Sequence, residues 1–137
     1  MVCYDNEYIY LSERLNEPMK GLLQVSGGKV DKGEGSLEAA MRETKEETGI
    51  EVDPKWTRYI EKDAEFNCDI FITKINKYPK LTEPNKMKEW KPYTFQEYLL
   101  RTQKGELTPS HTKFYEQILE KIFVNNLKLE MEGQDIT

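Results

Sequence analysis

Three glutamates, Glu43, Glu46 and Glu47, are spaced so that a helix would carry them on one face. Like charges at positions i, i+3 and i+4 repel by roughly 0.2–0.5 kcal/mol per pair, so folding alone does not favour this arrangement. A divalent cation would turn the repulsion into attraction, and Mg²⁺ prefers oxygen ligands of this kind and bridges to phosphate. The spacing therefore indicates a metal site that acts on a phosphate compound. The alternative is a solvated helix face on which Arg42 and Lys45 form compensating ion pairs.

The segment that must carry these carboxylates has the signals of a helix over 36–48. Ser36 is a small polar residue of the kind that caps helix N-termini, Glu38 falls in the first turn, and Gly49 is a typical C-terminal stop. The opposite face holds small or apolar side chains that we expect to pack on a sheet, namely Leu37, Ala40, Met41, Thr44 and Thr48.

The rest of the chain predicts the sheet and two more helices. Apolar or aromatic runs typical of strands occur at 1–4, 8–11, 22–25, 56–60 and 70–75. Thr94 and Glu97 have the spacing of a capping box and predict a short helix, and Thr108 with the following proline begins the last one. We therefore expect one α/β sandwich over 1–131, followed by a frayed tail at 132–137.

Composition excludes several classes of protein. The 137 residues include 20 Lys and Arg against 25 Asp and Glu, a net charge of -5 that disfavours a stable nucleic-acid partner. Cys3 and Cys68 are far apart, which argues against a disulfide framework and a zinc site. Because no apolar run approaches the roughly 20 residues needed to cross a bilayer, we expect no membrane partner and a cytoplasmic location.

A longer pattern surrounds the glutamates. Gly28, Glu34 and the run Arg-Glu-Thr-Lys-Glu-Glu-Thr-Gly-Ile at 42–50 resemble the Nudix box, the signature of the Nudix (MutT-like) hydrolase family. Every fixed Gly, Glu and Arg of that pattern is present, and Thr44 stands where Leu or Ala is usual. The resemblance implies an α+β fold, a Nudix-type α/β/α sandwich with a mixed central sheet, in which the box forms a loop, a helix and a second loop.

The resemblance continues outside the box. Residues 10–14, Tyr-Leu-Ser-Glu-Arg, resemble the family's strand that ends in a basic residue. Residues 23–28 resemble its entry to the box, with Ser26 in place of the usual Pro. Residues 83–86, Glu-Pro-Asn-Lys, followed by Trp90, resemble a stretch of the branch that hydrolyses nucleoside triphosphates.

The resemblance also implies a metal centre for Mg²⁺, with Mn²⁺ as a substitute. Its predicted ligands are the Gly27 carbonyl and the carboxylates of Glu34, Glu43, Glu46, Glu47 and Glu83. Glu34 would be an additional ligand or a support for the others, and Glu83 is as compatible with an ordinary loop acid. Arg42 would orient a glutamate by a charge-assisted hydrogen bond, the alternative being a salt bridge on the helix surface.

Four residues are candidates for binding the substrate. Arg14 would contact phosphate and Gln24 would read a base edge, because a side-chain amide offers both a donor and an acceptor. Trp90 and Tyr93 would stack on a base, although aromatic residues near strands more often belong to the core. His111, the only histidine, falls in the first turn of the last helix, where a surface or packing role is favoured over catalysis.

The activity implied is metal-dependent hydrolysis of a nucleoside triphosphate to a nucleoside monophosphate and pyrophosphate. Arg42, Glu43, Glu46 and Glu47 would form the catalytic set, with Glu43 or Glu46 as general base. The alternatives are hydrolysis of ADP-ribose, a dinucleoside polyphosphate or an RNA cap, and a catalytically silent nucleotide-binding module. A homodimer is plausible from the resemblance.

Overall fold

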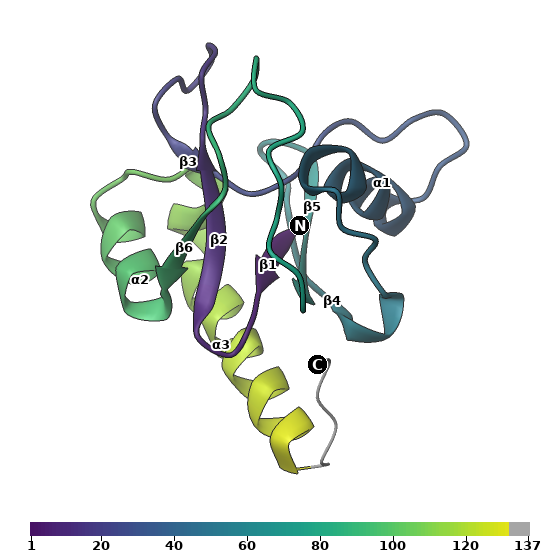
Figure 1. Ribbon diagram of the computed structural model, residues 1–137, viewed down its shortest axis with the longest axis vertical. Helices are drawn as coiled ribbons and strands as arrows, with labels where there is room; N and C mark the ends of the chain where they lie inside the picture. Colours follow the sequence, from purple (N-terminus) through teal and green to yellow (C-terminus); the bar gives the residue numbers. More distant parts are fainter. Residues whose placement is uncertain (132–137) are drawn as a thin grey trace.

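The computed structural model describes residues 1–131, so the tail predicted at 132–137 lies outside the described residues (Figure 1). The secondary-structure elements are β1 (Val2–Tyr4), β2 (Tyr8–Glu13), β3 (Leu23–Gln24), α1 (Ser36–Thr48), the 3-10 turn η1 (Pro54–Trp56), β4 (Thr57–Asp63), β5 (Cys68–Lys74), β6 (Lys91–Thr94), α2 (Phe95–Gln103) and α3 (Pro109–Met131). No helix within this part of the chain is both long and apolar enough to span a membrane.

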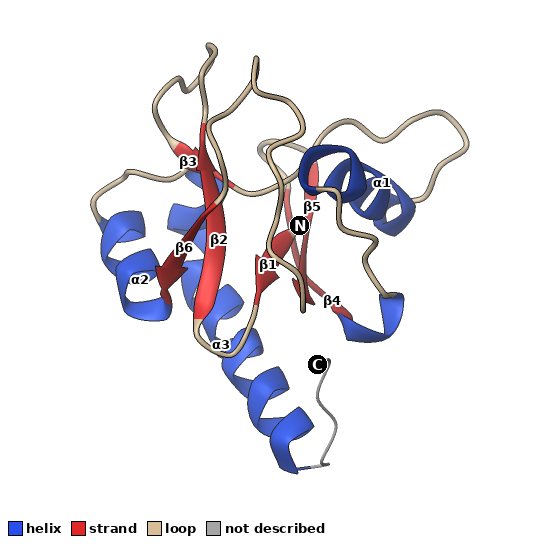
Figure 2. Ribbon diagram, in the orientation of Figure 1, coloured by secondary structure: helices blue, strands red, loops and turns tan. Residues whose placement is uncertain are grey.

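The strands form one six-stranded mixed sheet in the order β3-β2-β1-β5-β4, with β6 also paired to β2. Strand β1 is parallel to β5, whereas its pairing with β2 is antiparallel. Helices cover both faces, as Figure 2 shows: α1 lies on one side, and α2 and α3 lie on the other. Two hydrophobic clusters fill the layers, one under α2 and α3 and one under α1. The predicted α/β/α sandwich with a mixed central sheet is confirmed.

Two elements show what local sequence patterns can miss. The first strand is only three residues long, yet all three are buried because β1 lies between β2 and β5. Strand β6 was not predicted, since Lys91–Thr94 is partly exposed and lacks an apolar alternation. Its strand geometry comes instead from antiparallel pairing with β2, where Tyr93 faces Ile9 across the ladder.

The ends of helix α1 confirm one capping prediction and correct another. Gly49 adopts the left-handed conformation with φ 76°, and its N–H donates to the Lys45 carbonyl at 2.9 Å, as expected of a C-terminal stop. The N-cap is Gly35, so the prediction that Ser36 caps the helix is wrong. The Ser36 hydroxyl instead donates to the Asp69 carboxylate of β5 at 2.6 Å and thereby ties the start of α1 to the sheet.

His111 is nearly buried and packs against α2, which is one of the two roles, surface or packing, that the sequence favoured over catalysis. It is 3% exposed, and its Nδ1 lies 2.6 Å from the hydroxyl oxygen of Tyr98 in α2. Burial lowers the pKa of His111 to about 3, because the imidazolium would be desolvated there.

This buried histidine makes stability depend on pH. Because the folded-state pKa lies below the unfolded value of about 6.5, its neutral form stabilises the fold above pH 6.5, and that stabilisation is lost as the pH falls towards 3. We expect the free-energy gap between wild type and His111→Asn, measured by urea unfolding, to be about 1 kcal/mol smaller at pH 5.5 than at pH 7.5. A gap that does not change with pH would show that His111 titrates normally.

Candidate active site

The turn that precedes the box docks onto α1 through two buried hydroxyl groups. The Thr44 hydroxyl donates to the Ala40 carbonyl at 2.7 Å, so its oxygen is left to accept from the Ser26 hydroxyl at 2.8 Å. Both residues are buried, and this pairing satisfies polar groups that would otherwise be costly there. Thr44 is also the position at which the chain departs from the box pattern, and Ser26 is where it departs from the usual entry to the box. The two departures are therefore partners in space.

The next two residues of the turn contact the predicted metal ligands. The Gly27 N–H donates to the Glu47 carboxylate at 2.7 Å. A Cβ at Gly28 would overlap the Glu43 carboxylate, so only glycine leaves room for that side chain. The turn thus places two glutamates of α1, and the Glu47 contact uses the Gly27 amide, whereas the sequence predicted a role for its carbonyl.

Arg42 holds three of the predicted carboxylates together. Its Nε and Nη2 donate to Glu34 at 2.8 and 3.0 Å, and its Nη1 donates to Glu43 at 2.9 Å and to Glu46 at 3.3 Å. This contact lowers the pKa of Glu34. Nη2 also donates to the Lys29 carbonyl at 3.0 Å, which fixes the loop before the helix. Such a network fits an orienting residue better than it fits a single surface ion pair.

The loop between β5 and β6 caps the C-terminus of α1. Three consecutive carbonyls accept from it: Glu46 from the Thr82 hydroxyl, Glu47 from the Trp90 indole N–H at 3.0 Å, and Thr48 from the Lys80 N–H at 2.9 Å. These bonds satisfy carbonyls that the helix itself leaves without partners. They also bring Glu83 close enough for its charge to act on Glu47.

Glu47 is the most perturbed carboxylate of the site. It is 7% exposed, and burial together with the charges of Glu43 and Glu83 raises its pKa to about 7, against the opposing effect of the Gly27 N–H. A buried carboxylate with a shifted pKa and like-charged neighbours is a feature of functional sites.

The predicted ligands suit a hard divalent cation by their chemistry, but their carboxylates do not point to one common position. Within residues 1–131, no three carboxylate, imidazole or thiol groups are close enough together to hold a metal ion as they stand. Glu43 and Glu46 face Arg42, and Glu47 faces the Gly27 amide. The oxygen chemistry and the mutual repulsion of these carboxylates fit Mg²⁺.

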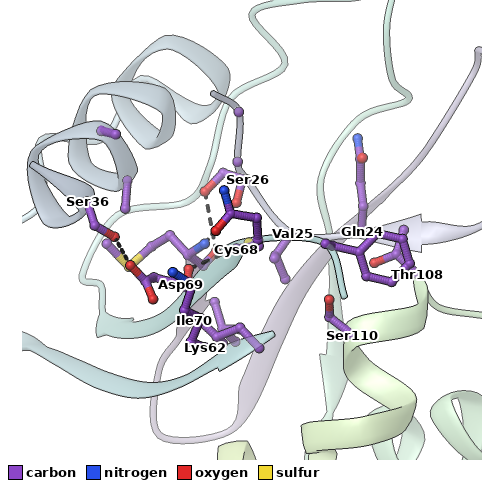
Figure 3. A pocket seen from close by; sticks show the side chains of 18 of the residues that line it. Gln24, Val25, Ser26, Ser36, Lys62, Cys68, Asp69, Ile70, Thr108 and Ser110 are labelled. Atoms are coloured by element: carbon purple, nitrogen blue, oxygen red, sulfur yellow. Dashed lines mark hydrogen bonds between the residues drawn. The ribbon is translucent and has the colours of Figure 1, made fainter. Parts of the chain in front are cut away.

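A cavity of about 730 Å³ begins at the same turn (Figure 3). Its wall is built by Gly27 and Gly28, the first turns of α1, the ends of β4 and β5 with the turn between them, and the start of α3. Arg14 and Gln24 also line it and are joined by a hydrogen bond from Arg14 Nη1 to Gln24 Oε1 at 2.8 Å. These two predicted substrate residues therefore lie together beside the box turn.

Trp90 and Tyr93 lie away from this cavity; the stacking role predicted for Trp90 is wrong, and that of Tyr93 stays a prediction. Trp90 is 3% exposed and packed against the end of α1, so neither face of its ring is open to a base. Tyr93 packs partly against the cluster under α2 and α3, and the Arg101 guanidinium lies 5.5 Å from its ring centre. Neither residue lines the cavity.

The cavity contains residues that the sequence did not single out as binding residues. Lys62 and Asp69 come from β4 and β5, and Ser110 comes from the start of α3. Ser110 donates to the Asp63 carboxylate at 2.7 Å, a contact between positions 47 residues apart. No local motif marks such residues, because only the folded topology brings them to one wall.

The family is shown by comparison with known proteins. The family model described as NUDIX domain matches residues 1–118, so the chain belongs to the NUDIX domain family and is a Nudix-type pyrophosphohydrolase domain. A search of curated proteins finds no match.

Solved structures share the fold at low sequence identity. A MutT structure from a study of Aliivibrio salmonicida and Vibrio cholerae superposes with TM-score 0.67 at 19% identity, over 88% of this chain and 92% of that one. The NUDIX domain of Shewanella oneidensis NrtR, complexed with ADP ribose, gives TM-score 0.67 at 18% identity, over 88% and 84%. A C. elegans Ap4A hydrolase gives TM-score 0.56 at 21% identity, over 72% and 80%.

Proposed function

We propose that this protein hydrolyses a nucleoside triphosphate to a nucleoside monophosphate and pyrophosphate with the help of Mg²⁺. The observation that carries the proposal is the buried carboxylate of Glu47 at the box turn, whose pKa is raised by burial and by the charges of Glu43 and Glu83. A buried carboxylate beside two like charges costs stability unless a cation neutralises it. The adjoining cavity has the size of a small-molecule site and is lined by the same turn.

The chain's own residues would bind and orient the reactants. Glu43, Glu46, Glu47 and Glu83 would hold the metal, which when bound neutralises phosphate charge and lowers the pKa of an attacking water. Arg42 holds Glu34, Glu43 and Glu46 in place, and the Gly27 N–H holds Glu47. Arg14 would contact phosphate beside the turn. The general base stays a prediction between Glu43 and Glu46, as do a homodimer and a cytoplasmic location.

The second candidate is a Nudix hydrolase that acts on ADP-ribose or a dinucleoside polyphosphate. It is supported by the similarity in fold to a NUDIX domain complexed with ADP ribose and to an Ap4A hydrolase. RNA caps are less favoured, because a net charge of -5 repels a polyanion.

A substrate panel with product analysis tests the proposal. The protein with Mg²⁺ is given ribo- and deoxyribonucleoside triphosphates, ADP-ribose and diadenosine tetraphosphate at equal concentration, in water enriched in ¹⁸O. We expect triphosphates to give the highest kcat/KM, with one monophosphate and one pyrophosphate released per turnover. Preferred turnover of ADP-ribose or the dinucleotide would support the second candidate. Absence of turnover on every compound would support a silent binding module.

A further inference from the structure

His111 forms part of the wall of the cavity that the box turn also bounds. It comes from the first turn of α3, and Gly27 and Gly28 line the same cavity. A nucleotide whose phosphates lie at the turn would place its base in this cavity. In that pose the imidazole of His111 would belong to the wall that surrounds the base.

Tyr98 fixes which nitrogen of His111 carries the hydrogen. Tyr98 is 0% exposed, so its hydroxyl hydrogen needs an acceptor, and we assign this hydrogen to the contact with the Nδ1 of His111 at 2.6 Å. Nδ1 therefore accepts, and Nε2 carries the hydrogen of the neutral ring. The lowered pKa of His111 agrees with a neutral imidazole at physiological pH.

The Nε2 hydrogen is free to meet a ligand. Among the described residues, no hydrogen bond uses Nε2, and the enclosed polar atoms that lack a partner are Thr102 Oγ1 and Asn126 Oδ1. Nε2 has no partner and is not one of these enclosed atoms, so it is in contact with open space. The open space that His111 borders is the cavity. A nearly buried N–H that opens into a cavity is an unused and directional donor.

The same wall offers a second donor beside an acidic residue that is already hydrogen-bonded. The Asp69 carboxylate already accepts from the Ser36 hydroxyl at 2.6 Å and from the Tyr59 hydroxyl at 3.3 Å. Lys62, which also lines the cavity, has no acidic side chain within salt-bridge distance among the described residues and adds another donor. A ligand edge that presents acceptors is therefore matched by two donors of this wall, His111 and Lys62.

We propose that His111 is a specificity-determining residue, which donates from Nε2 to the base and selects bases with a carbonyl oxygen at that edge over bases with an amino group. Hypoxanthine, guanine and uracil belong to the favoured class, and adenine to the disfavoured one. This inference rests on the proposed function, because it needs a nucleotide whose base enters the cavity. Placing an amino group against an N–H leaves both donors unpaired, which corresponds to a selectivity of about tenfold or more.

ITP and ATP test the selectivity, because they share sugar and phosphates and differ at position 6 of the base. We expect kcat/KM for ITP to exceed that for ATP by about tenfold or more in the wild type. His111→Asn keeps a carbonyl oxygen that can accept from Tyr98 but removes the Nε2 donor, and should bring the ratio close to one. Equal kcat/KM for the two nucleotides in the wild type would overturn the inference.

Tyr98→Phe provides a second variant that leaves the imidazole in place. Without the hydroxyl, Nδ1 can carry the hydrogen and Nε2 can accept, so the ratio should fall because ATP improves relative to ITP. Tyr115→Phe, a similar change beside the same hydrophobic cluster, is the matched control and should leave the ratio unchanged. A purely structural role would lower both rates together, and an unchanged ratio in both His111→Asn and Tyr98→Phe would contradict the proposal.

Binding separates this inference from the proposed function. If neither triphosphate is hydrolysed, the proposed function fails, but calorimetry with IMP and AMP still measures base selectivity. Tighter binding of IMP in the wild type, lost in His111→Asn, supports the role of His111. Equal dissociation constants overturn it.

Discussion

Replacing Glu47 with glutamine should lower kcat by about 100-fold or more and yet leave the metal-free fold more stable than the wild type at pH 8. The rate should fall because an amide is a poor ligand for Mg²⁺ and because a small misplacement of reacting groups costs about 10²-fold. The free energy of unfolding should rise because glutamine keeps an oxygen that accepts from the Gly27 N–H. It also removes a charge that is buried near Glu43 and Glu83.

The direction of the stability change follows from the pKa. The folded-state pKa of Glu47 is raised from 4.5 to about 7, so the wild type loses stability as the pH rises from about 4.5 through 7. At pH 8 in EDTA, the glutamine variant should therefore be more stable by about 1–3 kcal/mol in urea unfolding. Addition of Mg²⁺ should stabilise the wild type and have little effect on the variant.

Glu51→Gln is the control for this change of charge. Glu51 lies just beyond the box, is exposed, and pairs with Lys45 at 2.8 Å, so its loss should affect neither kcat nor the response to Mg²⁺. If Glu47→Gln keeps wild-type turnover, Glu47 does not hold the metal. If Glu47→Gln is less stable than the wild type in EDTA, then the charge of Glu47 does not destabilise the metal-free fold.

The parts of the fold that sequence predicted well are those with local physical causes. The bounds of α1 agree with the prediction because its amphipathic pattern and the stop at Gly49 both lie within the segment itself. The capping box of Thr94 and Glu97 formed for the same reason. Strand β6 escaped prediction because its geometry comes from pairing with β2, which is distant in sequence.

The candidate site also has one part that local sequence determines and one part that depends on contacts between distant segments. One segment of chain carries Glu34, Arg42, Glu43 and Glu46, so their contacts could be expected from the box alone. The place of Glu83 depends on a loop that caps α1, and the burial of Trp90 depends on that loop as well. Sequence recognised both residues but could not distinguish a stacking ring from one that anchors the loop.

Gly28→Ala should lower kcat/KM by about 100-fold without unfolding the protein. Both Gly27 and Gly28 are exposed and neither has a positive φ, so alanine suits the backbone at either position. The difference between them is the neighbour: a Cβ at Gly28 meets the Glu43 carboxylate, whereas a Cβ at Gly27 meets nothing within 4 Å. The carboxylate must then turn away from the position that Arg42 gives it, and a shift of about 1 Å is enough for a loss of this size.

Gly27→Ala is therefore a matched control one residue away, with the same change in side chain and in backbone freedom. It should keep kcat/KM within about threefold of the wild type, and both variants should unfold within about 1 kcal/mol of it, as expected for exposed positions. Titration with Mn²⁺ in the absence of nucleotide should show weaker metal binding for Gly28→Ala only. Only the Gly28 substitution displaces the Glu43 carboxylate. Equal effects of the two substitutions would therefore mean that activity depends on the flexibility of the turn and not on the position of Glu43.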